Sequence, residues 1–280
     1  MSEQDMQHSI QGWQAELNMG FRRSQGKTVL SRLNHFGPLR VQRPFYPEQD
    51  VCHVYMLHPP GGLVGGDQLV INIHCEQHAH SLLTTPGSTK FYRSAGDYAE
   101  VTQNITVEEG GIIEWFPQEN ILFPGAKAKI KTQIHLTGSA QFIGWEINCL
   151  GRPVNNERFF QGSMDSLLLL YRDNIPQLLE RLKVNSLKHL NASTGLRNYP
   201  MQATFIATGC GEAELELVRN LLAEIQAGFP HGVTLVDGML LLRVLGERTE
   251  KIQRLMIPVW QALRPSLLGK QATVPRIWAT

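Results

Sequence analysis

Two stretches in which apolar and polar residues alternate predict half-buried β-strands. In residues 99–107 the apolar residues all fall on odd positions, and in residues 126–136 alanine, isoleucine and leucine share one face. The opposite face of the second stretch carries Lys127, Lys129, Lys131, Gln133 and His135. A period of two residues is typical of a strand with one buried side. We expect the lysine-rich face to be solvated or to protect a sheet edge, with a docking surface as the alternative.

Residues 166–185 contain two apolar runs that are compatible with either a helix or a β-hairpin. The segment between the runs holds Asp173, Asn174 and Pro176. Aspartate and asparagine tolerate the left-handed backbone of tight turns, and proline fixes the backbone at a turn. We therefore predict a hairpin whose turn lies in this segment.

Two segments near the C-terminus have the spacing of amphipathic helices. The apolar stripe of the first consists of Leu215, Val218, Leu221, Leu222 and Ile225. Glutamates crowd its first turn, where the helix dipole favours negative charge, and Gly228 and Pro230 are expected to end it. The stripe of the second consists of Ile252, Leu255, Met256, Val259, Trp260 and Leu263. Because the ring of Pro258 clashes with the carbonyl of Arg254, we expect this second helix to be kinked or split.

These patterns predict a mainly β fold, with a β-rich body and a small helical part near the C-terminus. A length of 280 residues suggests one large domain or two small ones. Because no linker, repeat or low-complexity tract divides the sequence, we treat residues 1–280 as a single domain. Residues 1–12 are polar and are expected to form a disordered tail.

Composition narrows the choice of partners and compartment. The 26 Lys and Arg residues balance 25 Asp and Glu residues, so a net charge of +1 gives no support to a nucleic-acid or membrane partner. No secretory signal or membrane-spanning run is evident, and the four cysteines lie far apart, as expected for reduced thiols in the cytoplasm. With only 18% charged residues, the surface is expected to associate with partners.

Residues 58–69 form a loop rich in glycine and proline, "HPPGGLVGGDQL". Gly61 and Gly66 have the spacing of a phosphate-binding loop, but Asp67 stands where that motif requires lysine. A carboxylate at this point would repel a phosphate. The loop is therefore interpreted as a rigid segment that presents Asp67, with an ordinary tight turn as the alternative.

The stretch "HCEQHAH", residues 74–80, could form a metal site. A hairpin centred on Gln77 would place His74 opposite His80, and imidazole suits nickel or zinc. No zinc-binding spacing is matched, however, and histidines also gather at polar hairpin tips by chance. Glu114, Glu119, Lys90 and Arg93 could supply acid–base groups, but no catalytic motif is recognisable.

Five stretches together resemble the urease accessory protein D family, UreD (also called UreH). They are "HPPGGLVGGDQL", "TTPGSTKFYRS", "EWFPQENILFPGA", "GRPVNNERF" and "LRPSLLGKQATVPRIWAT". They occur in the family's order from residue 58 to the terminus, and residues 13–48 match its opening strands. One departure is Asn156, which stands where the family usually has glycine before the glutamate, here Glu157.

This resemblance implies a maturation factor without catalytic activity. Its fold would be stacked β-sheets with β-helical character and a few helices. Proteins similar to this one form a complex with urease accessory protein F and the GTPase accessory protein G, and dock on apo-urease. No cofactor would be tightly bound, because nickel arrives on other proteins and passes inward in transit.

Several residues can be assigned expected roles on this basis. Oxygen donors hold a divalent ion weakly enough to release it, so Asp67, Glu119 and Glu157 are expected to line an internal nickel passage. The alternative is that they are structural hydrogen-bond acceptors in turns. A partner-binding role is expected for Trp260, Arg276, Ile277 and Trp278, because tryptophan and arginine are enriched at binding hot spots; the alternative is that Trp278 pins the tail to the core.

Two other functions remain open at this point. The first is a metal-dependent hydrolase that uses His58, Asp67 and the histidines of residues 74–80. The second is a plain β-rich binding module.

Overall fold

The structure, a computed structural model, describes residues 12–279. The first eleven residues of the predicted tail and Thr280 lie outside the described residues. Gly12, the last residue of that tail, packs against the backbone of Gly66, where a Cβ atom would come within 2.1 Å of the carbonyl carbon. Gly12 therefore belongs to the packed part of the chain, and the disordered tail expected over residues 1–12 otherwise stays a prediction.

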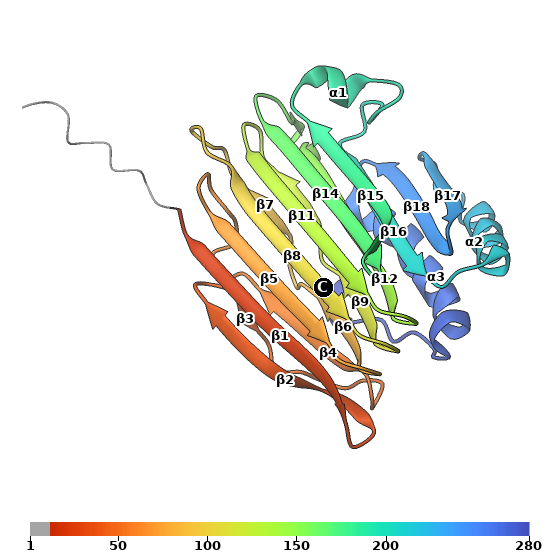
Figure 1. Cartoon of the computed structure of the whole chain (residues 1–280). Helices are drawn as coiled ribbons and strands as arrows, with labels where there is room; N and C mark the ends of the chain where they lie inside the picture. The colour runs from red at the N-terminus through yellow and green to blue at the C-terminus, as the bar shows by residue number, and fades with distance from the viewer. Residues whose placement is uncertain (1–11, 280) are drawn as a thin grey trace, which may run out of the picture.

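The chain forms a β-solenoid of about four turns in which two sheets face each other (Figure 1). The seven-stranded sheet has the order β15–β14–β11–β8–β5–β1–β2. Its strands are β1 (Gln14–Ser24), β2 (Lys27–Phe36), β5 (Gln68–Cys75), β8 (Ala99–Val107), β11 (Lys127–Leu136), β14 (Ser163–Arg172) and β15 (Ile175–Val184).

The eleven-stranded sheet has the main order β17–β18–β16–β12–β9–β6–β4–β3, and β7, β10 and β13 join it beside this path. Its strands are β3 (Arg40–Val41), β4 (Cys52–Leu57), β6 (His80–Thr84), β7 (Thr89–Phe91), β9 (Ile112–Phe116), β10 (Asn120–Leu122), β12 (Gln141–Arg152), β13 (Glu157–Arg158), β16 (Met201–Thr208), β17 (His231–Val236) and β18 (Met239–Gly246).

Each turn of the solenoid places one strand in each sheet. The chain passes from β4 to β5, from β6 to β8, from β9 to β11 and from β12 to β14. Successive turns pair in parallel within both sheets. Apolar side chains from the facing sides of the sheets meet between them and form the larger hydrophobic core.

The α-helices of the described residues are α1 (Leu187–Asn191), α2 (Glu212–Ile225) and α3 (Thr249–Leu268), with short 3-10 helices at Pro153–Asn155 and Arg276–Ala279. Helices α2 and α3 cover the far side of the eleven-stranded sheet, whereas Leu190 of α1 is buried in the core between the sheets. Side chains of α2 and α3 form a second core with β12, β16 and β18. None of the helices in residues 12–279 combines the length and apolar character that a membrane span requires.

The two predicted strands are confirmed as β8 and β11. The solvated character of the lysine-rich face is confirmed too, because Lys129 and Lys131 are exposed. The edge-protecting role is wrong, because β11 lies inside the sheet between β8 and β14. The hairpin in residues 166–185 is confirmed as β14 and β15, and Asp173 and Asn174 have φ values of 50° and 63° at its turn.

Both predicted helices are present, with two differences at their ends and interior. Helix α2 ends at Ile225 because Gln226 adopts the left-handed conformation, two residues before Gly228. Helix α3 is not split, since it continues through Pro258 and also through Pro265. Its buried side chains, which run from Ile252 to Arg264 along one stripe, hold it against the sheet and compensate for the hydrogen bonds that proline cannot donate.

The predicted hairpin in residues 74–80 is wrong. His74 lies on β5 in the seven-stranded sheet, whereas His80 begins β6 in the other sheet. The segment between them is a crossover from one sheet to the other. His74 and His80 therefore do not face each other across a strand pair.

Candidate functional site in the cavity between the sheets

A cavity of about 700 Å³ lies between the two sheets. Four neighbouring strands of the seven-stranded sheet contribute one row of residues in register to its wall, namely Ile71, Gln103, Thr132 and Leu168. The facing sheet contributes Trp115, Phe142, Glu146 and Ile206. The loops that follow β4 and β6 complete the wall with His58, Gly61 and Ser88, and strand β7 adds Lys90. The cavity is thus part of the solenoid interior, and residues distant in sequence meet there.

Glu146 is the one acidic residue among those that line this cavity. Its Oε1 accepts hydrogen bonds from the Ser166 hydroxyl at 2.6 Å and from the Asn148 amide at 2.7 Å. Burial raises the pKa of Glu146 although these two hydrogen bonds oppose the shift, and the nearby charge of Glu180 raises it further. The carboxyl can therefore change its charge at a higher pH than an exposed glutamate.

The other polar groups on the wall are mostly neutral. The Thr132 hydroxyl donates to the Gln103 side-chain oxygen at 2.9 Å. Burial lowers the pKa of His58, although the charge of Asp67 opposes the shift. His58 is therefore a neutral imidazole at physiological pH, which is the form that binds metal ions.

Asp67 serves as an internal acceptor for the glycine-rich loop. Its Oδ1 accepts from the backbone N–H of Trp13, and its Oδ2 accepts from that of Val64, both at 2.8 Å. The carboxylate is buried and ties the loop to the start of β1. This geometry corresponds to the structural alternative that the sequence left open.

Glu119 joins two loops beside the cavity. Its Oε1 accepts from the Ser88 hydroxyl at 2.8 Å, and its backbone carbonyl accepts from the N–H of Thr89 at 3.0 Å. Ser88 and Thr89 themselves line the cavity. Glu119 thereby positions a segment of the cavity wall.

Glu157 lies at a different cavity, of about 800 Å³. Arg152 donates to its carboxylate, with 2.7 Å between Nε and Oε2. The preceding Asn156 has a φ of 58°, a left-handed conformation that asparagine tolerates better than most residues. The replacement of the family's usual glycine is therefore compatible with this turn. Asp67, Glu119 and Glu157 are not brought together, and none of them lines the cavity between the sheets.

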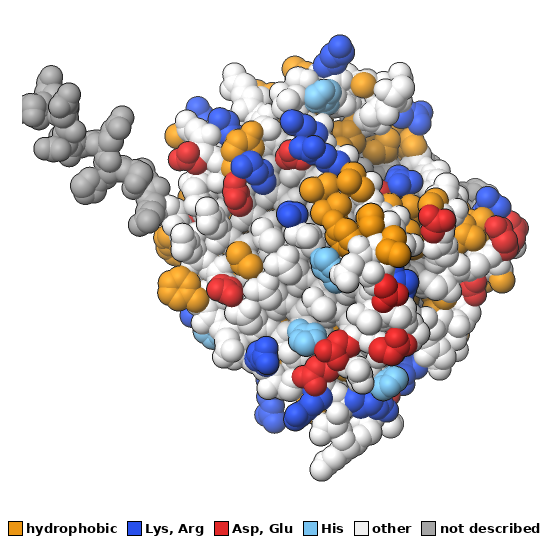
Figure 2. Space-filling model, in the orientation of Figure 1, with side chains coloured by type: hydrophobic (Ala, Val, Ile, Leu, Met, Phe, Trp, Pro, Cys, Tyr) orange, Lys and Arg blue, Asp and Glu red, His pale blue; other side chains and the backbone are white. Residues whose placement is uncertain are grey.

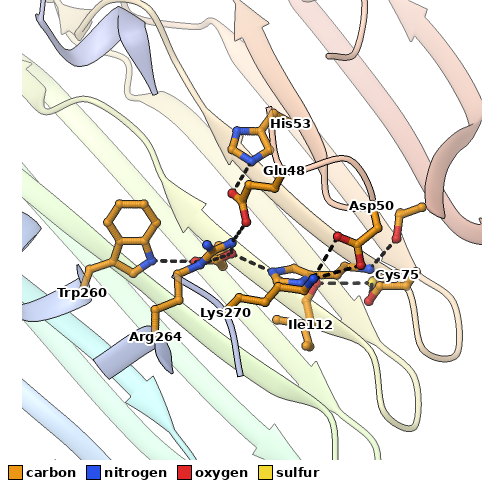
Figure 3. Close-up of polar contacts among 12 residues, drawn as sticks. Glu48, Asp50, His53, Cys75, Ile112, Trp260, Arg264 and Lys270 are labelled. Atoms are coloured by element: carbon orange, nitrogen blue, oxygen red, sulfur yellow. Dashed lines mark hydrogen bonds and ion pairs between the residues drawn. The ribbon is translucent and has the colours of Figure 1, made fainter. Parts of the chain in front are cut away.

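A buried charge cluster connects α3 to the solenoid (Figure 3). The Arg264 guanidinium lies between two carboxylates, with Nη2 2.7 Å from Oε2 of Glu48 and 2.9 Å from Oε1 of Glu114. Each carboxylate also contacts a histidine. His53 lies 2.8 Å from the other oxygen of Glu48, Oε1, and His80 lies 2.7 Å from the same Oε1 of Glu114 that Arg264 contacts. All five side chains are buried.

Glu114 is held in its charged form by this cluster. Burial alone would raise its pKa, but the hydrogen bond with His80 and the charges of His80 and Arg264 outweigh burial and lower the pKa to about 2. The indole N–H of Trp260 donates to Glu114 Oε2 at 2.6 Å. The carboxylate considered for acid–base chemistry is therefore a buried structural acceptor.

The C-terminal tail packs on the molecule itself. The Trp278 ring lies 5.1 Å from that of Trp145 and 5.6 Å from those of Phe116 and Trp260, measured between centroids. Its indole N–H donates to the Thr84 hydroxyl at 3.0 Å. Trp260 is fully buried, so a partner could contact it only after the tail had moved. The docking role predicted for this end, Arg276 and Ile277 included, stays a prediction.

The histidines of residues 74–80 have separate partners. His74 pairs with Glu108 at 2.8 Å on the surface, and His80 belongs to the buried cluster. Within residues 12–279 no group of three or more histidine, cysteine or acidic side chains is placed to hold a metal ion.

Comparison with known proteins identifies the family. The model of the UreD urease accessory protein family matches residues 14–279. The chain belongs to the UreD family. UreD of Alcanivorax borkumensis is 58% identical over 96% of this chain and 93% of its own length. UreD of Aliivibrio fischeri strain MJ11 is 46% identical, over 97% of this chain and 98% of its own.

UreD of Escherichia coli is 45% identical over 96% of this chain and 98% of its own length. The chain is therefore a urease maturation factor of a family without catalytic activity, as the resemblance implied. The hydrolase alternative requires His74 and His80 to act together, but they lie on strands of different sheets. The family does not support this alternative either.

Sequence reasoning missed Glu146 and Arg264. Glu146 is the single acidic residue of β12, a strand that is otherwise mainly apolar, and this was the available signal. Arg264 occupies the apolar stripe of α3, four residues after Trp260. A charged residue on a buried stripe indicates a buried counter-charge.

Proposed function

We propose that this chain is a scaffold for nickel transfer in urease maturation. In this role it docks on apo-urease in the cytoplasm, together with urease accessory proteins F and G, and the cavity between its sheets forms part of the route by which nickel reaches the urease active site. The observation that carries the proposal is a cavity inside the solenoid of a UreD family member, whose mainly apolar wall holds one carboxyl and a few neutral oxygen donors.

The chemistry of the wall supports passage of a divalent ion. The groups that face the cavity include the Glu146 carboxyl, the Gln103 amide and the Thr132 hydroxyl. Oxygen donors of this kind bind nickel less tightly than imidazole or thiolate sets. An ion that meets one carboxylate and several neutral oxygens can be released onward, which a transfer protein requires.

Asp67, Glu119 and Glu157, the residues expected to line the nickel passage, have different roles in this proposal. Asp67 and Glu119 hold the two loops that complete the cavity wall. Glu157 lies at the separate cavity of about 800 Å³ and would act there. Glu146 is the carboxylate that we expect a passing ion to meet between the sheets.

A deletion strain tests the function. Cells without this chain are expected to make apo-urease that is folded but nickel-poor, because the metal lacks its route into the buried site. The nickel content of purified urease, measured by elemental mass spectrometry, checks this expectation. Normal nickel content in urease from the deletion strain would overturn the proposed function.

Variants of Glu146 test the route separately. In the complemented strain, Glu146→Leu is expected to lower the nickel content of urease severalfold, while Glu146→Gln, which keeps an oxygen donor, lowers it less. Glu100→Gln is the matched control, because Glu100 is an acidic residue on the outer face, paired with Lys129. Equal nickel loading by wild type and a folded Glu146→Leu variant would exclude the cavity as the route and leave the maturation role intact.

A further inference from the structure

The outer face of the seven-stranded sheet is polar over most of its width. One row of residues in register crosses this face, from Asn18 through Asn72 and Asn104 to Gln133. The Asn72 amide donates to Asn18 and the Asn104 amide donates to Asn72, both at 2.8 Å. These side chains satisfy one another and leave a surface suited to water.

The same row becomes apolar on the last two strands. Gln133 is followed by Leu169 of β14 and then by Leu179 of β15. Leu168 and Leu170 alternate with Leu169 and are buried on the inner face, so Leu169 faces outward. The Leu179 side chain is 68% exposed. Figure 2 shows hydrophobic side chains gathered over β14 and β15 on this face.

We call Leu167, Leu169, Tyr171 and Leu179 the leucine patch. Basic residues border it on the neighbouring strands, because Leu167 lies in register between Lys131 of β11 and Arg181 of β15, and Lys183 follows Arg181. Asp165 neutralises Arg181 at 2.6 Å. The charge of Lys183, in register opposite Asp165, acts on that same carboxylate, and Lys131 is in no ion pair of residues 12–279. One carboxylate thus faces Arg181, Lys183 and Lys131, which leaves the border of the patch with net positive charge.

We propose that the leucine patch is a docking surface for a protein partner that presents apolar side chains bordered by carboxylates. Leu179 is exposed, and the three patch residues of β14 are half-buried. Adjoining apolar side chains that reach the surface mark interaction sites, and the net positive charge of the border selects an acidic rim on the partner. The proposal rests on the proposed function in one respect, since the partner is sought among apo-urease and the two accessory proteins.

The double variant Leu169→Ser with Leu179→Ser tests the patch. Its affinity for purified apo-urease, protein F and protein G is measured separately by biolayer interferometry, and one of the three is expected to bind at least about tenfold more weakly. Leu33→Ser is the matched control, because Leu33 is an exposed leucine on β2, the strand at the opposite end of the same sheet. Circular dichroism and thermal unfolding verify that both variants are folded.

A second double variant tests the charge of the partner. Lys131→Glu with Lys183→Glu is expected to slow association with that same protein and to remove most of its dependence on salt. Lys251→Glu, on the exposed start of α3, is the matched control and should change neither quantity.

The outcomes separate this inference from the proposed function. Wild-type affinity of the folded leucine variant for all three proteins would overturn the docking surface and leave the maturation role standing. The same follows if only self-association of the chain is lost, since the occupant would then be a second copy. A wild-type chain that binds none of the three proteins would overturn the docking surface together with the scaffold role.

Discussion

Glu114 connects three elements through one carboxylate. It accepts hydrogen bonds from Trp260 and Arg264 of α3 and pairs with His80 of β6, while it belongs to β9 itself. A buried charge is costly unless it is paired and hydrogen-bonded. Removal of one member would leave the others charged and unpaired inside the protein, so the cluster fixes where α3 sits on the solenoid.

The pH dependence of unfolding should report Glu114. Its pKa falls from 4.5 to about 2 on folding, so between these values the unfolded state binds more protons. The stabilisation is therefore fully present above the unfolded pKa and is lost as the pH falls toward 2. We expect the free energy of unfolding in urea to decrease over this range, and the difference between wild type and Glu114→Gln to decrease with it.

Glu216→Gln is the control for this measurement, because Glu216 lies on the exposed face of α2. Its difference from wild type should stay small at both ends of the range. If the free energies of unfolding of Glu114→Gln and wild type differed by the same amount at neutral pH and at pH ~3, the charge of Glu114 would not be the stabilising factor.

Single residues could be singled out where local chemistry decides their role. Asp67 stood out because it lies in a glycine-rich loop, and its carboxylate holds that loop as in the structural alternative, while its expected role in a nickel passage stays a prediction. Glu146 did not stand out, because its importance comes from Gln103 and Thr132 on the facing sheet. When a residue's neighbours come from another part of the chain, the sequence around it gives little indication of its role.

Elements show the same distinction between local and distant contacts. The hairpin of β14 and β15 was predicted correctly because its turn residues, Asp173 and Asn174, carry the positive φ values that such turns require. The predicted hairpin in residues 74–80 was wrong because an apolar–polar alternation does not indicate which sheet a strand joins. In a parallel solenoid the next strand along the chain belongs to the opposite sheet.

Helix α3 illustrates how packing overrides local preference. Pro258 should break a helix in isolation, yet α3 is continuous from Thr249 to Leu268. The apolar stripe around Trp260 is buried against the eleven-stranded sheet, and Arg264 adds the charge cluster. The sequence correctly indicated the buried stripe but not the strength of its contacts.

The C-terminal tail can be tested by Trp278→Ala. We expect the melting temperature to fall, because the substitution removes contacts with three aromatic rings and a hydrogen bond to Thr84. If the tail also docks on protein F, affinity for protein F should fall by about 2 kcal/mol or more. Calorimetry and titration on one preparation measure both quantities.

Trp13→Ala is the control for the tail, because Trp13 is a 60% exposed tryptophan at the other end of the described chain. It should leave the melting temperature nearly unchanged. A lowered melting temperature for Trp278→Ala with unaltered affinity for protein F would refute the docking role and restrict Trp278 to packing.

At the scale of the whole molecule, the mainly β class followed from the alternation of residues, whereas the β-helical character followed from the family resemblance. Alternation in β8 and β11 identifies strands with one buried face. It does not identify their parallel pairing, which depends on contacts between turns of the solenoid. The cavity between the sheets was therefore beyond prediction from the pattern alone.

The surface of the whole molecule leads to the last prediction. A net charge of +1 and only 18% charged residues leave little overall electrostatic repulsion between copies, and the leucine patch places apolar surface in contact with water. Neutral surfaces with exposed apolar patches associate readily. We expect the chain alone to self-associate as its concentration rises at physiological salt, and added protein F to restore a single defined complex, as measured by light scattering and analytical ultracentrifugation. A concentrated, monodisperse sample of the lone chain that protein F does not alter would show that its surface needs no partner.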